Sequence, residues 1–181
     1  MFHRTERLML RPAWPEDWEM ILWGIGDERV VRNLAKAPWP YLPEHAREFA
    51  ARGQDPRHPA FLLTFPEEQG SRLVGCAGLG ESEGGTEIGY WIAQPYWNRG
   101  FATEGARGML EVARLLGHRR IEGRHFLDNP ASGRVLRKLG FVPTGKTGML
   151  KSLGRSEASA SVLYTLDLDG EVEPVMPLQA A

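Results

Sequence analysis

Hydrophobic and polar residues alternate at the start of the chain, and helical spacing follows soon afterwards. Residues 5–10 alternate as in a half-buried strand. The segment 15–17 places a proline and two carboxylates where a helix begins well, and the apolar residues after it recur at helical spacing. Shorter helices are predicted over residues 27–35 and 43–52, on either side of a proline-broken loop at 39–43.

Three apolar runs of strand length occupy the middle of the chain. They cover residues 60–65, 72–80 and 86–93, and Pro95 stops the third. A Glu-Gly-Gly turn signal at residues 83–85 precedes this third run. Because turns this short join neighbouring strands antiparallel, we expect a meander.

Helices and strands then alternate in the second half. One helix is predicted over residues 100–117, with Gly117 as its C-terminal stop, and another over 129–138, with Asn129 as N-cap and Pro130 in its first turn. Strands are predicted over residues 120–126, 141–146 and 161–168. The order predicts a mixed α+β or α/β domain with helices packed on one sheet.

Length and composition narrow the class of protein. A chain of 181 residues predicts one domain, taken as residues 1–168, followed by a flexible C-terminal tail of residues 169–181. Hydrophobic residues at 42% and charged residues at 25% exclude wholesale disorder. A balance of 22 basic against 23 acidic residues argues against a nucleic-acid partner.

The single cysteine and the absence of long apolar segments bear on the compartment. Cys76 alone excludes an internal disulfide and a thiolate metal cluster, and its apolar neighbours predict a buried, inert thiol. No segment approaches the roughly 18 apolar residues that cross a bilayer, and the N-terminus lacks a signal-peptide core. We therefore expect a cytoplasmic protein with no membrane partner.

The loop before the predicted helix at 100–117 carries candidate chemistry. A helix N-terminus offers unpaired N–H groups and a partial positive charge, which bind phosphates. Gly100 and the small Ala102 allow a diphosphate to approach the backbone. The loop matches neither a Walker loop nor a dinucleotide fingerprint. Taken alone, an ordinary strand–helix turn explains it equally well.

Three ordered motifs, the first of them made of two segments, resemble one protein family. EIGYWI at residues 87–92 and YWNRGFATE at 96–104 resemble the acetyl-CoA signature of the GCN5-related N-acetyltransferase (GNAT) superfamily. They are most similar to its branch that acetylates the N-termini of ribosomal proteins. The segments 129–141 and 5–12 are similar to the later strand–helix–strand motif and to the start of that branch. One departure is Trp97, which replaces the usual Gln or Arg at the opening of the loop signature.

The resemblance, which covers about residues 5–168, implies a fold and a co-substrate. The fold is the α+β, three-layer acyl-CoA N-acyltransferase fold, whose mixed and mostly antiparallel central sheet is flanked by helices and splays at the cofactor site. The co-substrate is acetyl-CoA, with no metal, and Arg137 and Lys138 are candidates for its 3′-phosphate. The cofactor-binding residues implied by the resemblance are Trp91, Ile92, Ala93, Asn98, Arg99, Gly100, Phe101, Ala102, Thr103 and Asn129.

Three catalytic roles are implied as well. The Trp91 N–H would polarise the thioester carbonyl as an oxyanion donor. Glu87 matches the glutamate base of the histone-acetylating members, although a water chain or a merely solvent-facing glutamate remain alternatives. Ser132 is the candidate acid for the leaving thiolate, because the tyrosine that many members carry four residues later is Leu136 here. Structural roles also fit, with Asn129 as a plain N-cap and Ser132 as an exposed first-turn serine.

The implied reaction is acetyl transfer from acetyl-CoA to a primary amine by direct attack in a ternary complex. The acceptor is either a protein N-terminus or a small molecule, and its cleft is expected within residues 14–54, with the loop 145–157 as another wall. A non-catalytic acyl-CoA sensor and a transferase for a larger acyl group remain alternatives. A homodimer is left open. Glu104 is expected to pair with Arg107 on the helix surface.

Overall fold

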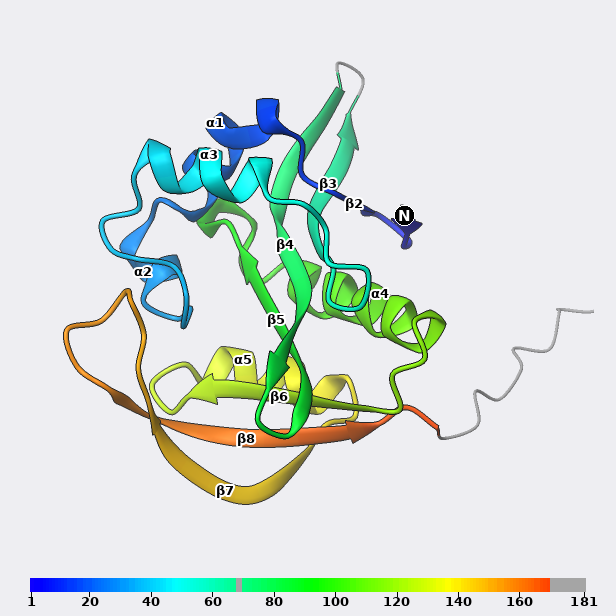
Figure 1. Ribbon diagram of the computed structural model, residues 1–181, viewed down its shortest axis with the longest axis vertical. Coiled ribbons are helices and arrows are strands. Elements are labelled where there is room, and N and C mark those ends of the chain that lie inside the picture. Colours follow the sequence, from blue (N-terminus) through cyan, green and yellow to red (C-terminus); the bar gives the residue numbers. More distant parts are fainter. Residues whose placement is uncertain (68–69, 170–181) are drawn as a thin grey trace, which may run out of the picture.

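The computed structural model describes residues 1–67 and 70–169, and within them eight strands form one sheet (Figure 1). The order across the sheet is β1-β2-β3-β4-β5-β6-β8-β7. The strands are β1 (His3–Arg4), β2 (Met9–Arg11), β3 (Ala60–Glu67), β4 (Gly70–Ser82), β5 (Gly85–Ile92), β6 (Arg120–Phe126), β7 (Val142–Leu150) and β8 (Ser159–Asp167). All neighbouring pairs are antiparallel except β5 and β6, so the predicted mixed and mostly antiparallel sheet is confirmed.

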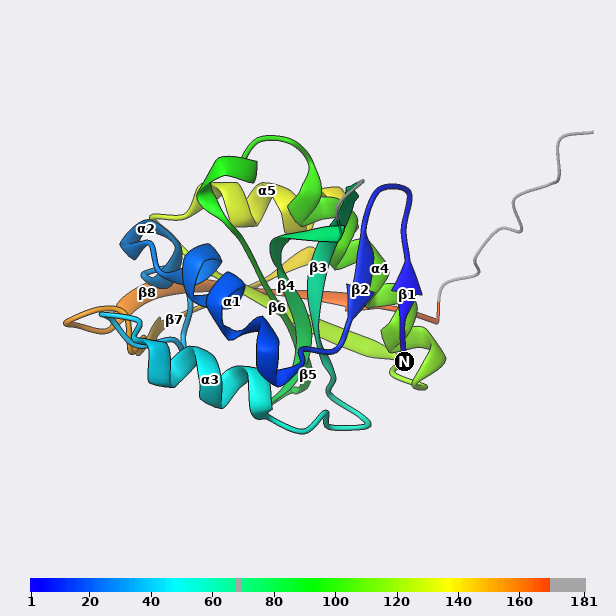
Figure 2. The same ribbon diagram turned by 90° about the horizontal axis from the view of Figure 1, so that it is seen from above.

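Helices cover both faces of this sheet and complete three layers (Figure 2). The helices are α1 (Trp18–Ile25), α2 (Glu28–Val31), α3 (Pro43–Ala51), α4 (Phe101–Leu115) and α5 (Pro130–Lys138). One apolar core lies between the sheet and α4 with α5, and a second lies between the sheet and α1 to α3. The α+β, three-layer fold implied by the resemblance is therefore confirmed. None of the helices in the described residues combines the length and the hydropathy that a membrane span requires.

Most predicted elements are present, and the largest difference lies at the N-terminus. A strand was predicted over residues 5–10, but residues 5–8 form a turn between β1 and β2 in which the Thr5 N–H donates to the Leu8 carbonyl at 2.9 Å. The turn is held to α4 because the Glu104 carboxylate accepts hydrogen bonds from the Thr5 hydroxyl and from the Arg7 backbone and side chain, each at 2.7 Å. Arg7 thus takes the place of the expected partner Arg107.

Predictions were also made for the single cysteine and for the C-terminal tail. Cys76 is buried in the core under α1 to α3, as expected, and burial raises the pKa of its thiol to about 12. The thiol therefore stays protonated at neutral pH. The flexible tail predicted over residues 169–181 lies outside the described residues from position 170 onward.

The sheet opens along one edge of β5. Against β4 the register is unbroken from Ser82 opposite Gly85 to Gly75 opposite Ile92. Against β6 the parallel pairing runs only from Thr86 to Ile88, although β5 continues to Ile92. Figure 1 shows β4 and β5 running along the vertical axis while β6 and β8 run across it. The predicted splay is confirmed, and it leaves one edge of β5 unpaired beyond Ile88.

Candidate active site

Side chains of β5 alternate between the two faces of the sheet, which separates the candidate residues. Ile88 and Ile92 are buried in the core under α4 and α5, and Tyr90 packs against this core. Trp91 packs instead against the core under α1 to α3, and Glu87 shares its face by parity. Two sets of polar groups therefore approach the open edge of β5 from opposite faces.

The backbone of β5 decides which N–H group faces the open edge. The Ala93 N–H donates to a β4 carbonyl at 2.9 Å, and hydrogen-bonded pairs alternate along an antiparallel ladder. The Trp91 N–H therefore points toward β4, whereas the backbone groups of Tyr90 and Ile92 point toward the open edge. In agreement, the Ile92 carbonyl accepts a hydrogen bond from the Trp97 indole on that side at 2.7 Å. The expectation for Trp91 is corrected, and the N–H at the open edge is that of Ile92.

The N-terminus of α4 offers a place for phosphate groups. Gly100 is the N-cap in a left-handed conformation with φ of 82°, and no side chain caps the helix there. The first N–H groups of a helix have no partner within it, so those of residues 101–103 are available to an anion. A Cβ on Gly100 would meet only an Arg7 nitrogen, at 3.5 Å, so the backbone is open to close approach.

Ser132 and Tyr90 meet between α5 and β5. The Ser132 Oγ lies 3.0 Å from the Tyr90 hydroxyl, which also donates to the Ser132 carbonyl at 3.2 Å. Asn129 Oδ1 accepts the Ser132 N–H at 3.3 Å, which confirms Asn129 as N-cap. Burial raises the pKa of Tyr90 to about 12, so its phenol remains protonated at neutral pH. Sequence reasoning missed Tyr90, although strand alternation would have placed it opposite Glu87.

Glu87 lies on the other face, half-buried rather than exposed to water. Burial raises the pKa of this carboxyl, the charges of Arg124 and Lys36 act against the rise, and Glu122 adds to it. Glu122 is the neighbour of Glu87 across the parallel pair, and it accepts a hydrogen bond from the Ser82 hydroxyl at 2.8 Å. A carboxylate with a raised pKa is a better proton acceptor than one in water.

An open bay adjoins Glu87 on this face. Gly80 lies opposite Glu87 on β4, Gly89 follows on the same face of β5, and a Cβ at either glycine would meet no atom within 4 Å. A cavity of about 310 Å³ borders Gly80 and is lined in part by Lys36 and Arg52. We call the cavity and the open surface over the two glycines the bay.

The cleft predicted within residues 14–54 thus supplies part of the bay, through residues 36, 49 and 52–54 and not through the tryptophans of that segment. Trp23 and Trp39 are exposed outside the cavity lining. Asp17 is buried and forms a two-point ion pair with Arg11, at 2.7 and 2.8 Å, so its role is structural. The 3′-phosphate candidate Arg137 donates to the Tyr164 hydroxyl at 3.0 Å.

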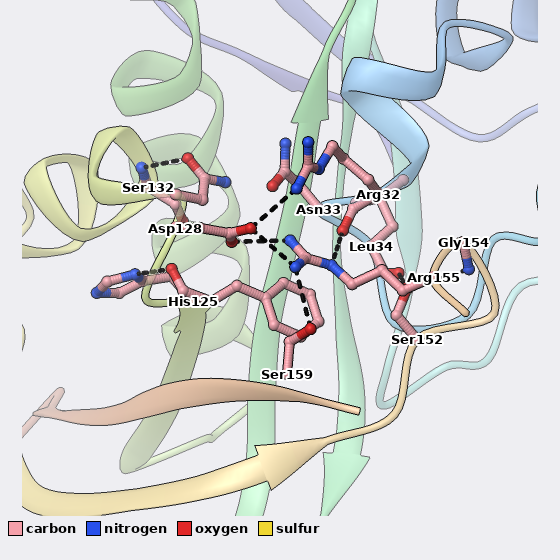
Figure 3. Close-up of polar contacts among 12 residues, drawn as sticks. Arg32, Asn33, Leu34, His125, Asp128, Ser132, Ser152, Gly154, Arg155 and Ser159 are labelled. Carbon is pink, nitrogen blue, oxygen red and sulfur yellow. Dashed lines mark hydrogen bonds and ion pairs between the residues drawn. The ribbon is translucent and has the colours of Figure 1, made fainter. Parts of the chain in front are cut away.

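Polar contacts tie the loop between β7 and β8 to the segment after α2 and to the start of α5 (Figure 3). Arg155 donates to both carboxylate oxygens of Asp128 at 2.8 and 2.9 Å and to the Arg32 carbonyl at 2.6 Å. The Ser152 hydroxyl donates to the Leu34 carbonyl. Asp128 directly precedes the N-cap of α5. We call these contacts of Arg155 and Ser152 the clip, because they join the loop, the segment after α2 and the start of α5.

Comparison with known proteins agrees with this geometry. Residues 7–142 match the family model described as the acetyltransferase (GNAT) domain. The chain is 30% identical over 148 residues to the Bacillus subtilis protein named "Uncharacterized N-acetyltransferase YoaA", covering 78% of this chain and 82% of that protein.

Two solved structures share the fold. The GNAT-family acetyltransferase from Bacillus anthracis has a TM-score of 0.77 at 24% identity, covering 92% of this chain and 98% of that one. The ribosomal L7/L12 α-N-protein acetyltransferase RimL, solved with coenzyme A, has a TM-score of 0.74 at 18% identity, covering 94% and 100%.

Proposed function

The chain belongs to the GNAT acetyltransferase family, and from this membership we propose that it transfers an acetyl group from acetyl-CoA to a primary amine by direct attack in a ternary complex. The observation that carries the proposal is the open edge of β5 beyond Ile88. The N-terminus of α4 follows this edge in the chain, and the bay with Glu87 lies on one face of the strand.

The binding half of the proposal uses mainly backbone. N–H groups from Asn98 to Thr103 hold the pyrophosphate at the start of α4, where the Glu104 N–H is already bonded to the Gly100 carbonyl. The Tyr90 carbonyl, which faces the open edge, accepts an N–H of the amide-bearing pantetheine arm as a neighbouring strand would. The Ile92 N–H is the oxyanion donor, and one such donor is worth roughly 3–4 kcal/mol where measured in other enzymes.

The chemical half uses one group on each face. The amine nitrogen attacks the thioester carbonyl from the bay, and Glu87 accepts the proton that the amine loses. As the C–S bond breaks, Ser132 donates its hydroxyl proton to the thiolate. Tyr90, 3.0 Å from the Ser132 Oγ, orients that hydroxyl and relays a proton to it.

The acceptor is best proposed from the bay and from the structural neighbours together. RimL is a ribosomal L7/L12 α-N-protein acetyltransferase, and its fold covers 94% of this chain. A protein N-terminus reaching into the bay is therefore our first proposal for the acceptor. A small-molecule amine is the second candidate, because the cavity of about 310 Å³ suffices for one.

Transfer of radiolabelled acetyl groups into a fractionated lysate of the host organism tests the proposal. Label on protein N-termini supports the first acceptor class, and label on small molecules supports the second. The matched variant Ser132→Ala is expected to keep its CoA affinity, measured by calorimetry, while turnover falls about 100-fold. CoA binding with no labelled product in any fraction would favour a non-catalytic sensor and overturn the proposal.

A further inference from the structure

The guanidinium of Arg124 lies on the Glu87 face of the sheet, and its Nε has no partner among the described residues. Strand alternation puts Arg124 on the same face as Glu122, whose contact with Ser82 fixes that face as the one bearing Glu87. The Arg124 Nε is buried with no hydrogen-bond partner. Across residues 1–67 and 70–169, the ion pairs within 4.0 Å include none to Arg124.

Two other arginines with little solvent exposure, Arg11 and Arg155, do form ion pairs. Arg11 is paired with Asp17, and Arg155 is paired with Asp128. A partly buried donor that has lost water without gaining an acceptor costs free energy, and buried donors are normally bonded. An arginine whose buried N–H lacks an acceptor, beside an open strand edge, is typical of a residue that binds a ligand.

Lys36 adds a second cation to the same region. It lines the cavity beside Gly80, and, like Arg124, it lies near enough to Glu87 to lower the pKa that burial raises. Neither cation forms an ion pair with Glu87 among the described residues. The space around the proposed base is therefore bordered by two cations, neither of which forms an ion pair among the described residues.

We propose that the acceptor amine carries a nearby carboxylate and that Arg124 binds this carboxylate while Glu87 receives the amine. The inference rests on the proposed function and adds the chemical class of the acceptor. The planar guanidinium matches a carboxylate in a two-point fashion, whereas Lys36 supplies a point charge at longer range. Arg124 belongs to β6 just beyond its pairing with β5, so a bound carboxylate lies beside the open edge where transfer would occur.

Matched acceptors that differ only in charge test this inference. Alanyl-aspartate amide is compared with alanyl-asparagine amide, and alanine with alaninamide, so that a side-chain carboxylate is distinguished from the α-carboxylate. We expect kcat/KM to favour the charged member of at least one pair by about 10- to 100-fold, mainly through KM. Arg124→Gln should bring that ratio close to one, and Arg124→Lys should retain part of it. Arg119→Gln, which removes a well-exposed guanidinium directly before β6, should leave the ratio unchanged.

Binding measurements separate failure of this inference from failure of the proposed function. The same acceptors are titrated by calorimetry into the CoA-loaded protein, so the charge preference is read without turnover. Carboxylate-dependent binding that Arg124→Gln removes supports the inference even if no acetyl transfer occurs. Equal affinity for both members of each pair, or a preference that survives Arg124→Gln in the folded variant, overturns it.

Discussion

Glu87 is a half-buried carboxyl group, and its surroundings favour the protonated form over the charged form. Burial raises its pKa, so the proton acceptor exists only above that raised value. The wild-type rate should therefore rise with pH through this pKa, and the ratio of wild-type to Glu87→Gln activity should be greatest, about 100-fold, on its high-pH side. The check is kcat/KM for the amine across pH for both proteins, since the acceptor's own titration cancels in the ratio. A ratio independent of pH would assign the base to a water chain.

The same substitution has a stability consequence that controls for misfolding. A carboxyl with a raised pKa binds protons more tightly in the folded state, so ionisation lowers the free energy of unfolding as pH rises from the unfolded pKa through the folded one. Glu87→Gln should therefore have a higher Tm than wild type at pH 8 but not at pH 4. A lower Tm for the variant at pH 8 would show that the charged form is stabilised in the fold.

How much of the site follows from sequence depends on whether a role uses local or distant geometry. Asn129 and Gly100 were identifiable because an N-cap and a loop glycine act within a few residues of themselves. Trp91 was given the wrong backbone direction because the parity of hydrogen bonds along β5 is fixed by its pairing with β4, which the sequence does not show. Arg124 gave no signal at all, since its significance is the lack of a partner across the sheet.

Helix α4 begins and ends at glycines in the left-handed conformation, which provides a matched pair of variants. The φ angles of Gly100 and Gly117 are 82° and 81°, and neither site is sterically crowded. Alanine at either position should lower the free energy of unfolding by a similar amount, about 1–2 kcal/mol. Only Gly100→Ala should also weaken CoA binding, because its Cβ projects where the pyrophosphate would approach. Urea denaturation and calorimetric titration of both variants give the two quantities, and equal CoA affinities would place the phosphates elsewhere.

At the level of elements, hydrophobic periodicity together with the glycines and prolines at element ends was enough to predict helix and strand bounds wherever these local signals agree. The meander of β3 to β5 and the helices α4 and α5 were predicted nearly to their observed bounds. The N-terminal strand was predicted as one piece because the turn at residues 5–8 is stabilised by Glu104, almost a hundred residues later. No local pattern contains that contact.

Across the whole molecule, the sheet order and the clip around Arg155 bring together segments that are far apart in the chain. Composition and spacing predicted layers of helices on a sheet, but the position of β8 between β6 and β7 depends on pairing energies summed over the fold. The loop 145–157 was expected as a wall of the cleft, and its far half is tied to the segment after α2 by Ser152 and Arg155. Such contacts fix the position of this loop relative to the segment after α2.

The clip predicts different effects for two arginines that share Asp128. The Arg155 side chain is 10% exposed and bonds Asp128, the Arg32 carbonyl and Ser159, whereas the Arg32 side chain is 52% exposed and reaches only Asp128 at 3.0 Å. Arg155→Gln should therefore lower the free energy of unfolding by about 2–4 kcal/mol, and Arg32→Gln by less than about 1 kcal/mol.

Acidity should weaken the same clip. The Arg155 hydrogen bond holds the pKa of Asp128 below its usual value, so the stabilisation is present above the unfolded pKa and is lost as pH falls through the lowered one. The difference between wild type and Arg155→Gln in urea should shrink over that acidic range and stay constant above it. Since the clip holds the segment after α2, which leads to Lys36 in the cavity lining, Arg155→Gln should raise KM for the acceptor more than KM for acetyl-CoA. Equal changes in both constants would mean that the clip supports the fold as a whole rather than this wall.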